Sequence, residues 1–159
     1  MKIKTIDIEL AIMFNENFTQ KLIVPNITNF FLNFECDMLV LSKAGYATGF
    51  EIKVSKSDLK NDLSKKHIIA CNNCSGREYY FKYFKYFNYA VPEFLKEEAL
   101  SQIPDFCGLY ILKNPKDMRS YECIRKPKML FNYQFSETER YEVARLGAMR
   151  VYNLKRSIR

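Results

Sequence analysis

Apolar residues near the start of the chain recur at helical spacing and predict an amphipathic helix from about Thr5 to Asn15. The side chains at this spacing, which we expect to face the core, are Ile6, Leu10, Met13 and Phe14. Glu9 would project from the same helix. A turn is expected at Val24-Pro25-Asn26, because Pro and Asn favour turns.

Two segments rich in Leu, Val, Ile, Phe and Tyr follow, at residues 35–42 and 46–55, and Gly45 lies between them. This pattern predicts a β-hairpin. After the hairpin we expect a helix from about Asp58 to Ala70, capped by Ser57. A strand at 86–91, a helix at 92–100 that Pro92 opens, a strand at 107–112 and an edge strand at 121–125 follow. The last expected element is a long basic helix that begins with the capping-box spacing of Ser136 and Glu139. The order α-β-β-α-β-α-β, with a late helix, predicts an α/β (α+β) fold in which helices flank a mixed sheet.

Length and composition favour one domain over residues 1–159, with a core at about 5–126 and a C-terminal helical extension at about 136–159. Hydrophobic residues make up 48% and charged residues 27% of the chain, as in globular proteins with a packed core. No apolar run of about 20 residues is present, so no membrane span is expected. An odd number of cysteines, five, and no export signal predict reduced thiols and a cytoplasmic location.

The net charge of +7 is uneven. Lys and Arg outnumber Asp and Glu by 6 to 3 in residues 41–66, and by 12 to 5 in residues 113–159. Positive charge beside carboxylates suits a nucleic acid, most simply DNA, because phosphates attract these side chains independently of sequence. The alternative is a solvated basic surface that contributes only solubility.

The hairpin allows its register to be worked out. If residues 43–45 form a three-residue loop with Gly45 in the left-handed conformation, Ser42 faces Tyr46 and Asp37 lies opposite Glu51. Opposed side chains have Cβ atoms about 4.5 to 5.5 Å apart, so these two carboxylates can share a cation. The sequence therefore predicts a Mg²⁺ or Mn²⁺ site at Asp37 and Glu51.

Lys53 shares the face of Glu51, because side chains alternate along a strand. Beside a metal, its ammonium can orient a water or stabilise developing phosphorane charge. The alternative is that Glu51 and Lys53 form an exposed cross-strand charge pair. For Glu9, the alternative is a solvent-facing acid on the first helix.

One spacing resembles the pattern of the PD-(D/E)xK nuclease superfamily: Asp37, a 13-residue gap and then Glu51-Ile52-Lys53. A closer similarity, to the MmcB-like DNA repair group, covers residues 5 to about 115. The stretches that carry it are VPN (24–26), ECDMLVLS (35–42), FEIKVSKSDLKND (50–62), KKH (65–67), YAVPEFL (89–95) and GLYIL (108–112). One departure is Cys36, which stands where the superfamily pattern has proline.

The resemblance implies a restriction-endonuclease-like core with Asp37 and Glu51 as metal ligands, Lys53 as the catalytic lysine and Glu9 as an auxiliary acid. It implies a metal-dependent nuclease that acts on DNA, in repair or in a phage or mobile-element process. The alternative is a non-catalytic or partner-dependent DNA-binding module on the same fold. A homodimer would provide the two sites needed to cut both strands of a duplex.

Polar residues directly after the catalytic strand are candidates for phosphate contacts. They are Ser55, Lys56, Ser57, Lys60 and Lys65. Alternatively, Ser57 is only a helix cap, and Lys65 with Lys66 is a solvated helix end. The basic C-terminal helix could extend the phosphate track or pack on another subunit.

Three further patterns remain. His67 lies too far along the expected helix from the carboxylates to be assigned a catalytic role. Cys71 and Cys74 have only half of the ligand pattern of a zinc or iron-sulfur site. The aromatic run from Tyr79 to Tyr89 either packs into the core or stacks on bases, and we favour the core.

Overall fold

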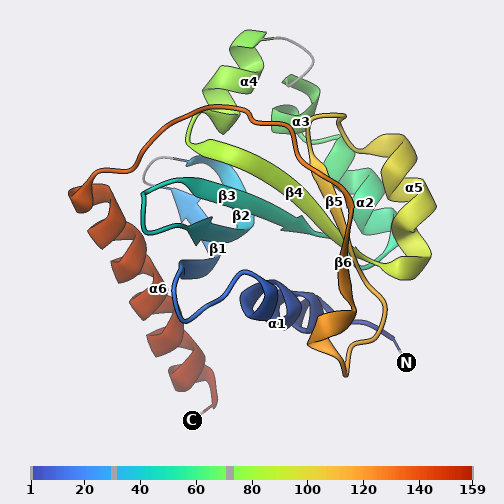
Figure 1. Cartoon of the computed structure of the whole chain (residues 1–159), viewed down its shortest axis with the longest axis horizontal. Helices are drawn as coiled ribbons and strands as arrows, with labels where there is room; N and C mark the ends of the chain where they lie inside the picture. The colour runs from blue at the N-terminus through green and yellow to red at the C-terminus, as the bar shows by residue number, and fades with distance from the viewer. Residues whose placement is uncertain (1, 30–31, 71–73, 159) are drawn as a thin grey trace.

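The computed structural model describes residues 2–29, 32–70 and 74–158. Six strands form one sheet in the order β1-β2-β3-β4-β5-β6 (Figure 1). Their bounds are β1 Leu22–Asn29, β2 Leu32–Leu41, β3 Ala47–Ile52, β4 Phe84–Pro92, β5 Gly108–Leu112 and β6 Tyr121–Arg125. Strands β3, β4 and β5 pair in parallel and the other neighbours are antiparallel, so the sheet is mixed.

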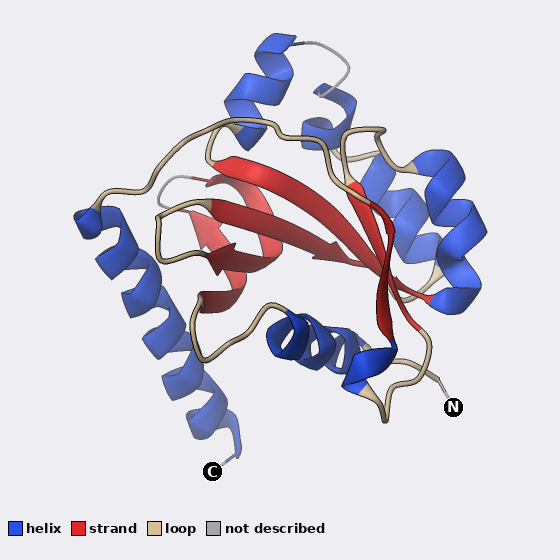
Figure 2. Ribbon diagram, in the orientation of Figure 1, coloured by secondary structure: helices blue, strands red, loops and turns tan. Residues whose placement is uncertain are grey.

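Helices cover both faces of this sheet (Figure 2). The bounds are α1 Thr5–Asn15, α2 Lys56–Leu63, α3 Lys66–Ala70, α4 Cys74–Phe81, α5 Lys96–Gln102 and α6 Glu137–Ile158, with short 3₁₀ turns η1 Glu93–Leu95 and η2 Met118–Ser120. Helix α1 packs on one face, α2 to α5 pack on the other, and α6 runs beside the edge strand β1. The expected α/β class, with helices around a mixed sheet and an added C-terminal helix, is confirmed.

Two apolar clusters fill the space between the helices and the sheet. One lies under α1 and includes Ile8, Ile12, Met38 and Phe50. The other lies under α2 to α5 and holds much of the aromatic run, with Phe81, Phe84, Phe87 and Tyr89 all fully buried. The interpretation of this run as core is thereby confirmed for those four rings, whereas Tyr79 is 58% exposed.

The register expected for the hairpin is confirmed. Met38 pairs with Phe50 and Leu41 with Ala47, and continuing this pairing places Asp37 opposite Glu51. Gly45 has a φ of +85°, the left-handed conformation that the loop requires. This loop therefore sets which side chains of β2 and β3 meet.

The first helix has the expected bounds but buries a different face. Ile8, Ala11 and Ile12 are fully buried, whereas Ile6, Leu10 and Phe14 are 51%, 46% and 48% exposed. Because α1 is apolar on more than one side, the periodicity alone does not select the buried stripe. The small Ala11 instead lets the helix approach the sheet closely.

The structure differs from the expected local structure in three places. Residues 24–26, which were expected to form a turn, lie inside β1. Pro25 is tolerated there because this strand is at the edge of the sheet. The single helix expected from Asp58 to Ala70 is two helices, α2 and α3, with Ser64 ending the first. Helix α4, at residues 74–81, was not expected at all.

The first cap is also reassigned. Ser55 accepts a hydrogen bond of 3.1 Å from the backbone N–H of Asp58 and caps α2, whereas Ser57 lies inside the helix. The capping box of α6 is confirmed, since Ser136 Oγ accepts from the backbone of Glu139 and Glu139 accepts from the backbone of Ser136. In the part of the chain that the structure describes, no helix is long and apolar enough to cross a membrane.

Candidate metal and nucleic-acid site

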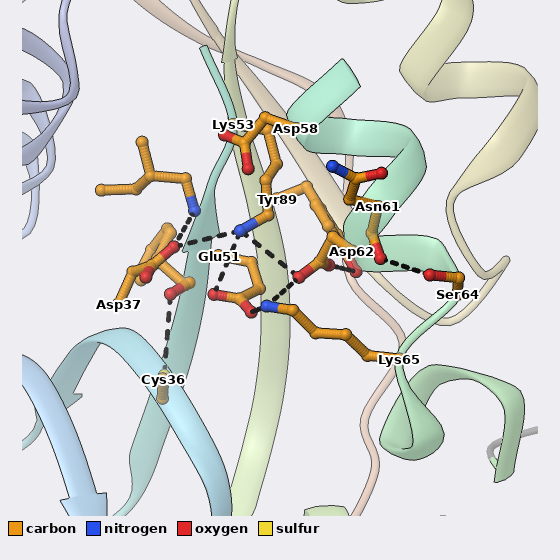
Figure 3. Close-up of polar contacts among 12 residues, drawn as sticks. Cys36, Asp37, Glu51, Lys53, Asp58, Asn61, Asp62, Ser64, Lys65 and Tyr89 are labelled. Carbon is orange, nitrogen blue, oxygen red and sulfur yellow. Dashed lines mark hydrogen bonds and ion pairs between the residues drawn. The ribbon is translucent and has the colours of Figure 1, made fainter. Parts of the chain in front are cut away.

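The end of β3 places two charged side chains in the interior, on the side covered by α2. Glu51 is 1% exposed and Lys53, just beyond the strand, is 4% exposed. The Lys53 Nζ lies 3.8 Å from Glu51 Oε2 (Figure 3). An exposed cross-strand pair is therefore the wrong interpretation of these residues, and burying them carries a cost that a surface pair does not have.

Asp37 reaches the same place from β2. Its Oδ2 accepts a hydrogen bond of 2.7 Å from the backbone N–H of Ile52 and lies 3.5 Å from Lys53 Nζ. The carboxylate takes this N–H because the β2–β3 pairing ends at Met38 and Phe50. The hairpin thus brings together Asp37, Glu51 and Lys53.

Asp62, which the sequence did not predict as a site residue, completes the cluster from α2. It is 1% exposed, and its Oδ1 lies 3.4 Å from Lys53 Nζ and 2.6 Å from Lys65 Nζ. The hydroxyl of Tyr89 on β4 donates a 2.7 Å hydrogen bond to Asp62 Oδ2. A signal was available, because Asp62 shares the helix face of the buried Leu59 three residues earlier.

The protonation of the cluster follows from burial and charge. Burial first, and then the neighbouring Asp37, raise the pKa of Glu51 well above its usual range. Although burial opposes the charged form, the nearby carboxylates of Glu51, Asp37 and Asp62 raise the pKa of Lys53. Lys53 therefore stays a cation at neutral pH.

The pKa of Asp62 moves the other way. Burial would raise it, but the ammonium groups of Lys53 and Lys65 and the hydroxyl of Tyr89 lower it overall. Asp62 is therefore a carboxylate at neutral pH, held between two lysines.

Glu9 approaches the site from α1 and is half-buried. Burial first, and then the charge of Asp37, raise its pKa. The charge of Asp37 acts on Glu9, which also lines the groove between α1, β1 and α6, whereas Glu35, two residues before Asp37 on the same strand, is exposed. The role of Glu9 as an auxiliary acid stays a prediction.

His67 is closer to the carboxylates than the sequence suggested. The break between α2 and α3 turns the chain back toward the sheet, and an imidazole nitrogen of His67, an oxygen of Glu51 and an oxygen of Asp62 lie within 4.8 Å of one another. The ring stacks on Phe34, with centroids 4.4 Å apart. Burial lowers the pKa of His67 to about 4, so the imidazole is neutral at physiological pH.

The candidate phosphate contacts separate into two groups. Lys65 joins the cluster through Asp62 and Glu51, and Ser55 serves as the helix cap. Lys56, Ser57 and Lys60 are exposed on α2, and Lys56 Nζ forms an ion pair of 3.0 Å with Glu98. These three side chains can reach an approaching ligand but do not line the buried cluster.

The donor set suits a hard divalent cation. Both carboxylate oxygens of Glu51 are buried and accept no hydrogen bond within the described residues, and the ammonium groups of Lys53 and Lys65 lie 3.8 Å away, so a cation bound directly to these oxygens would offset the cost of burying them. Asp37 supplies further oxygen ligands, as Mg²⁺ and Mn²⁺ prefer. The residues present therefore fit the metal that the sequence predicts.

The half-pattern of cysteine ligands is not resolved by the structure. Cys71 lies outside the described residues, and so does the side chain of Cys74. Among the described residues, Cys36, Cys107 and Cys123 form no disulfide.

Comparison with known proteins adds a fold and no function. No protein-family model matches the chain, and no curated protein matches it. A solved structure, the SPO1766 protein of unknown function from Silicibacter pomeroyi, is similar with a TM-score of 0.60 and 15% sequence identity. The match covers 95% of this chain and 88% of that one, so the fold is shared over nearly its whole length.

Proposed function

We propose that this protein is a metal-dependent phosphodiester hydrolase that acts on DNA, a nuclease of the PD-(D/E)xK type closest to the MmcB-like group. The observation that carries the proposal is the environment of Glu51: a buried carboxylate that accepts no hydrogen bond from the described residues, beside Asp37 and a charged Lys53. A restriction-endonuclease-like core places acids and a lysine in this way at the end of a hairpin.

The roles of the residues follow from this geometry. Asp37 and Glu51 would hold Mg²⁺ or Mn²⁺, which supplies a Lewis acid for water and for a phosphate oxygen. Lys53 stays charged next to them and can donate a hydrogen bond to the negative charge that develops on the phosphate. Glu9 would orient the metal or its water from α1.

DNA is the proposed substrate because basic side chains lie close in sequence to Asp62 of this acidic cluster. Lys56, Lys60 and Lys65 lie on or just after α2, and the chain carries a net charge of +7. Such lysines hold phosphates in register without reading the sequence. Participation in DNA repair or in a mobile-element process, a cytoplasmic location and a homodimer stay predictions.

A cleavage assay with Mg²⁺ or Mn²⁺ on single-stranded, duplex and flap DNA tests the proposal. We expect metal-dependent cutting that Asp37→Asn, Glu51→Gln and Lys53→Met each reduce by at least about a hundredfold. Glu35→Gln is the matched control, since Glu35 is exposed on the same strand.

The alternative function is a DNA-binding module without turnover. Salt-sensitive binding by the wild type, without cutting under any of these conditions, would establish that alternative and exclude the nuclease. Equal cutting by wild type and by all three variants would show that the activity does not come from this site.

A further inference from the structure

Glu51, Asp62 and His67 form a group of ligand atoms beyond the pair of carboxylates in the proposed nuclease site. One atom from each residue lies within 4.8 Å of the other two, and all three side chains are buried. They come from different elements, β3, α2 and α3, so only the tertiary structure brings them together. Ligands that share a metal at about 2.1 Å lie at most about 4.2 Å apart, so a small inward shift would suffice.

The two oxygens of Glu51 face different cations. Oε2 lies 3.8 Å from Lys53, on the side of Asp37, and Oε1 lies 3.8 Å from Lys65, on the side of Asp62 (Figure 3). Neither oxygen accepts a hydrogen bond within the described residues. One carboxylate can therefore serve two neighbouring cation positions.

Lys65 is the cation that contacts the second position. Its Nζ lies 2.6 Å from Asp62 Oδ1, while its side chain is 49% exposed. A lysine with this much exposure can turn into solvent without leaving an uncompensated charge in the interior. Lys53, whose side chain is only 5% exposed, has no such freedom.

We propose that Glu51, Asp62 and His67 bind a divalent transition-metal ion, such as Mn²⁺ or Zn²⁺, and that Lys65 competes with this ion for the two carboxylates. Carboxylate oxygens together with an imidazole nitrogen favour such metals over Mg²⁺. Glu51 would bridge this ion and the one at Asp37, as in sites where two metals act on one phosphate. The inference rests on the proposed function only for the ion at Asp37 and Glu51, because the ion at Asp62 and His67 is argued from its own ligands.

Calorimetric titration of the EDTA-treated full chain with Mn²⁺ tests the proposal. We expect two ions per chain in the wild type and one in Asp62→Asn or His67→Gln. Asp37→Asn should keep the ion that depends on Asp62. Circular dichroism identifies a variant that has lost its fold, and Asp62→Asn, which keeps the shape of the side chain, serves if His67→Gln unfolds.

Substitution of Lys65 provides a test in which metal binding should become tighter rather than weaker. Lys65→Met should tighten binding of the Asp62-dependent ion by on the order of tenfold, because it removes a competing charge. Lys66→Met is the matched control, since Lys66 is the exposed neighbour and forms no ion pair with the described residues of the cluster.

Anomalous scattering from crystals soaked with Mn²⁺ separates the two proposals. A peak between Asp62 and His67 is the expected result. A peak only between Asp37 and Glu51 would overturn this inference and leave the proposed nuclease site intact. A peak only at His67 would support this inference and overturn the proposed metal site at Asp37 and Glu51. No peak at either place would overturn both.

A separate observation concerns helix α6. Side chains on one exposed face of it recur at intervals of four and three residues, the spacing of a helix-helix seam. They are Glu137, Tyr141, Ala144, Ala148, Val151 and Lys155. Within the described chain, Val143 is the only fully buried residue of α6, so this exposed face packs against no other element. Because isolated helices are marginally stable in water, such a face is expected to pack against a partner.

The same face borders a groove on the described chain. This groove has a volume of about 670 Å³ and lies between α6, β1 and α1. Ala144, Ala148 and Val151 line it from α6, and Ile6, Glu9 and Met13 line it from α1. An apolar groove with helical walls suits an amphipathic helix.

The seam is complementary to itself. If two copies of α6 pair antiparallel so that Ala144 meets Ala148, then Tyr141 meets Val151 and Glu137 meets Lys155 at each end. The small alanines allow close approach, and opposite charges fix the direction. We infer that the occupant of the groove is α6 of a second copy of this chain, in a two-fold symmetric dimer.

Sedimentation equilibrium tests the dimer, which we expect for the wild type. Ala148→Glu should give a monomer, and Lys155→Glu should weaken the dimer at least about fivefold. Glu137→Lys combined with Lys155→Glu should restore it. Arg156→Glu, off the seam, is the control. A wild type that stays monomeric up to about 1 mM, or a double variant no better than Lys155→Glu, would overturn the inference.

Discussion

The hydroxyl of Tyr89 donates a 2.7 Å hydrogen bond to Asp62 Oδ2 in the interior of the protein. Tyr89 pairs with Glu51 across the parallel strands β3 and β4, so this bond fixes α2 at the level of the candidate site. The bond also satisfies one oxygen of a buried charge. The position of Asp62 therefore depends on the sheet as well as on its own helix.

Tyr89→Phe removes this hydroxyl and keeps the ring. We expect the free energy of unfolding, measured with urea, to fall by about 1.5 to 3 kcal/mol, because a hydrogen bond to a buried carboxylate is lost. Tyr79→Phe, at a ring that is 58% exposed, should change stability by less than about 0.5 kcal/mol. Equal effects of the two substitutions would contradict the importance of the Tyr89–Asp62 bond.

Metal should stabilise the folded chain. Mn²⁺ at about a hundred times its dissociation constant should add about 2.7 kcal/mol and raise the melting temperature by several degrees, since the folded state alone presents the assembled carboxylates. EDTA should reverse the shift. Glu51→Gln should greatly reduce it and Glu35→Gln should retain it, and a shift that survives Glu51→Gln would place the metal elsewhere.

Gly45→Ala tests the loop that sets the hairpin register. The φ of +85° is unfavourable for alanine, and an added Cβ would lie 2.9 Å from the backbone oxygen of Phe135. We expect a loss of at least about 1 kcal/mol in chemical unfolding. Gly147→Ala, within α6, is the comparison and should be close to neutral, because alanine favours the helix while its Cβ approaches Val24 at 3.3 Å.

The cap of α2 can be assigned by mutation. Ser55→Ala should cost about 1 kcal/mol, because the N–H of Asp58 loses its acceptor. Ser57→Ala, at an exposed position inside the helix, should cost less than about 0.5 kcal/mol. The reverse order in thermal unfolding would restore Ser57 as the cap.

Rules for turns and helix caps predict the structure correctly where residues close in sequence control the geometry. The loop at residues 43–45 fixes the register of β2 and β3, because a tight turn leaves one pairing for the strands that it joins. The capping box at Ser136 and Glu139 likewise depends on residues three apart. The sequence by itself thus determined the hairpin, the start of α6 and the proximity of Asp37 to Glu51.

Tertiary packing decided what periodicity could not. The first helix offers more than one apolar stripe, and only the shape of the sheet selects Ile8 and Ile12 over Ile6 and Leu10. Asp62 and His67 reach Glu51 because α2 ends at Leu63 and the chain turns back. Which charges share the interior depends on contacts between distant segments, and those contacts exist only once the sheet and its helices have packed together.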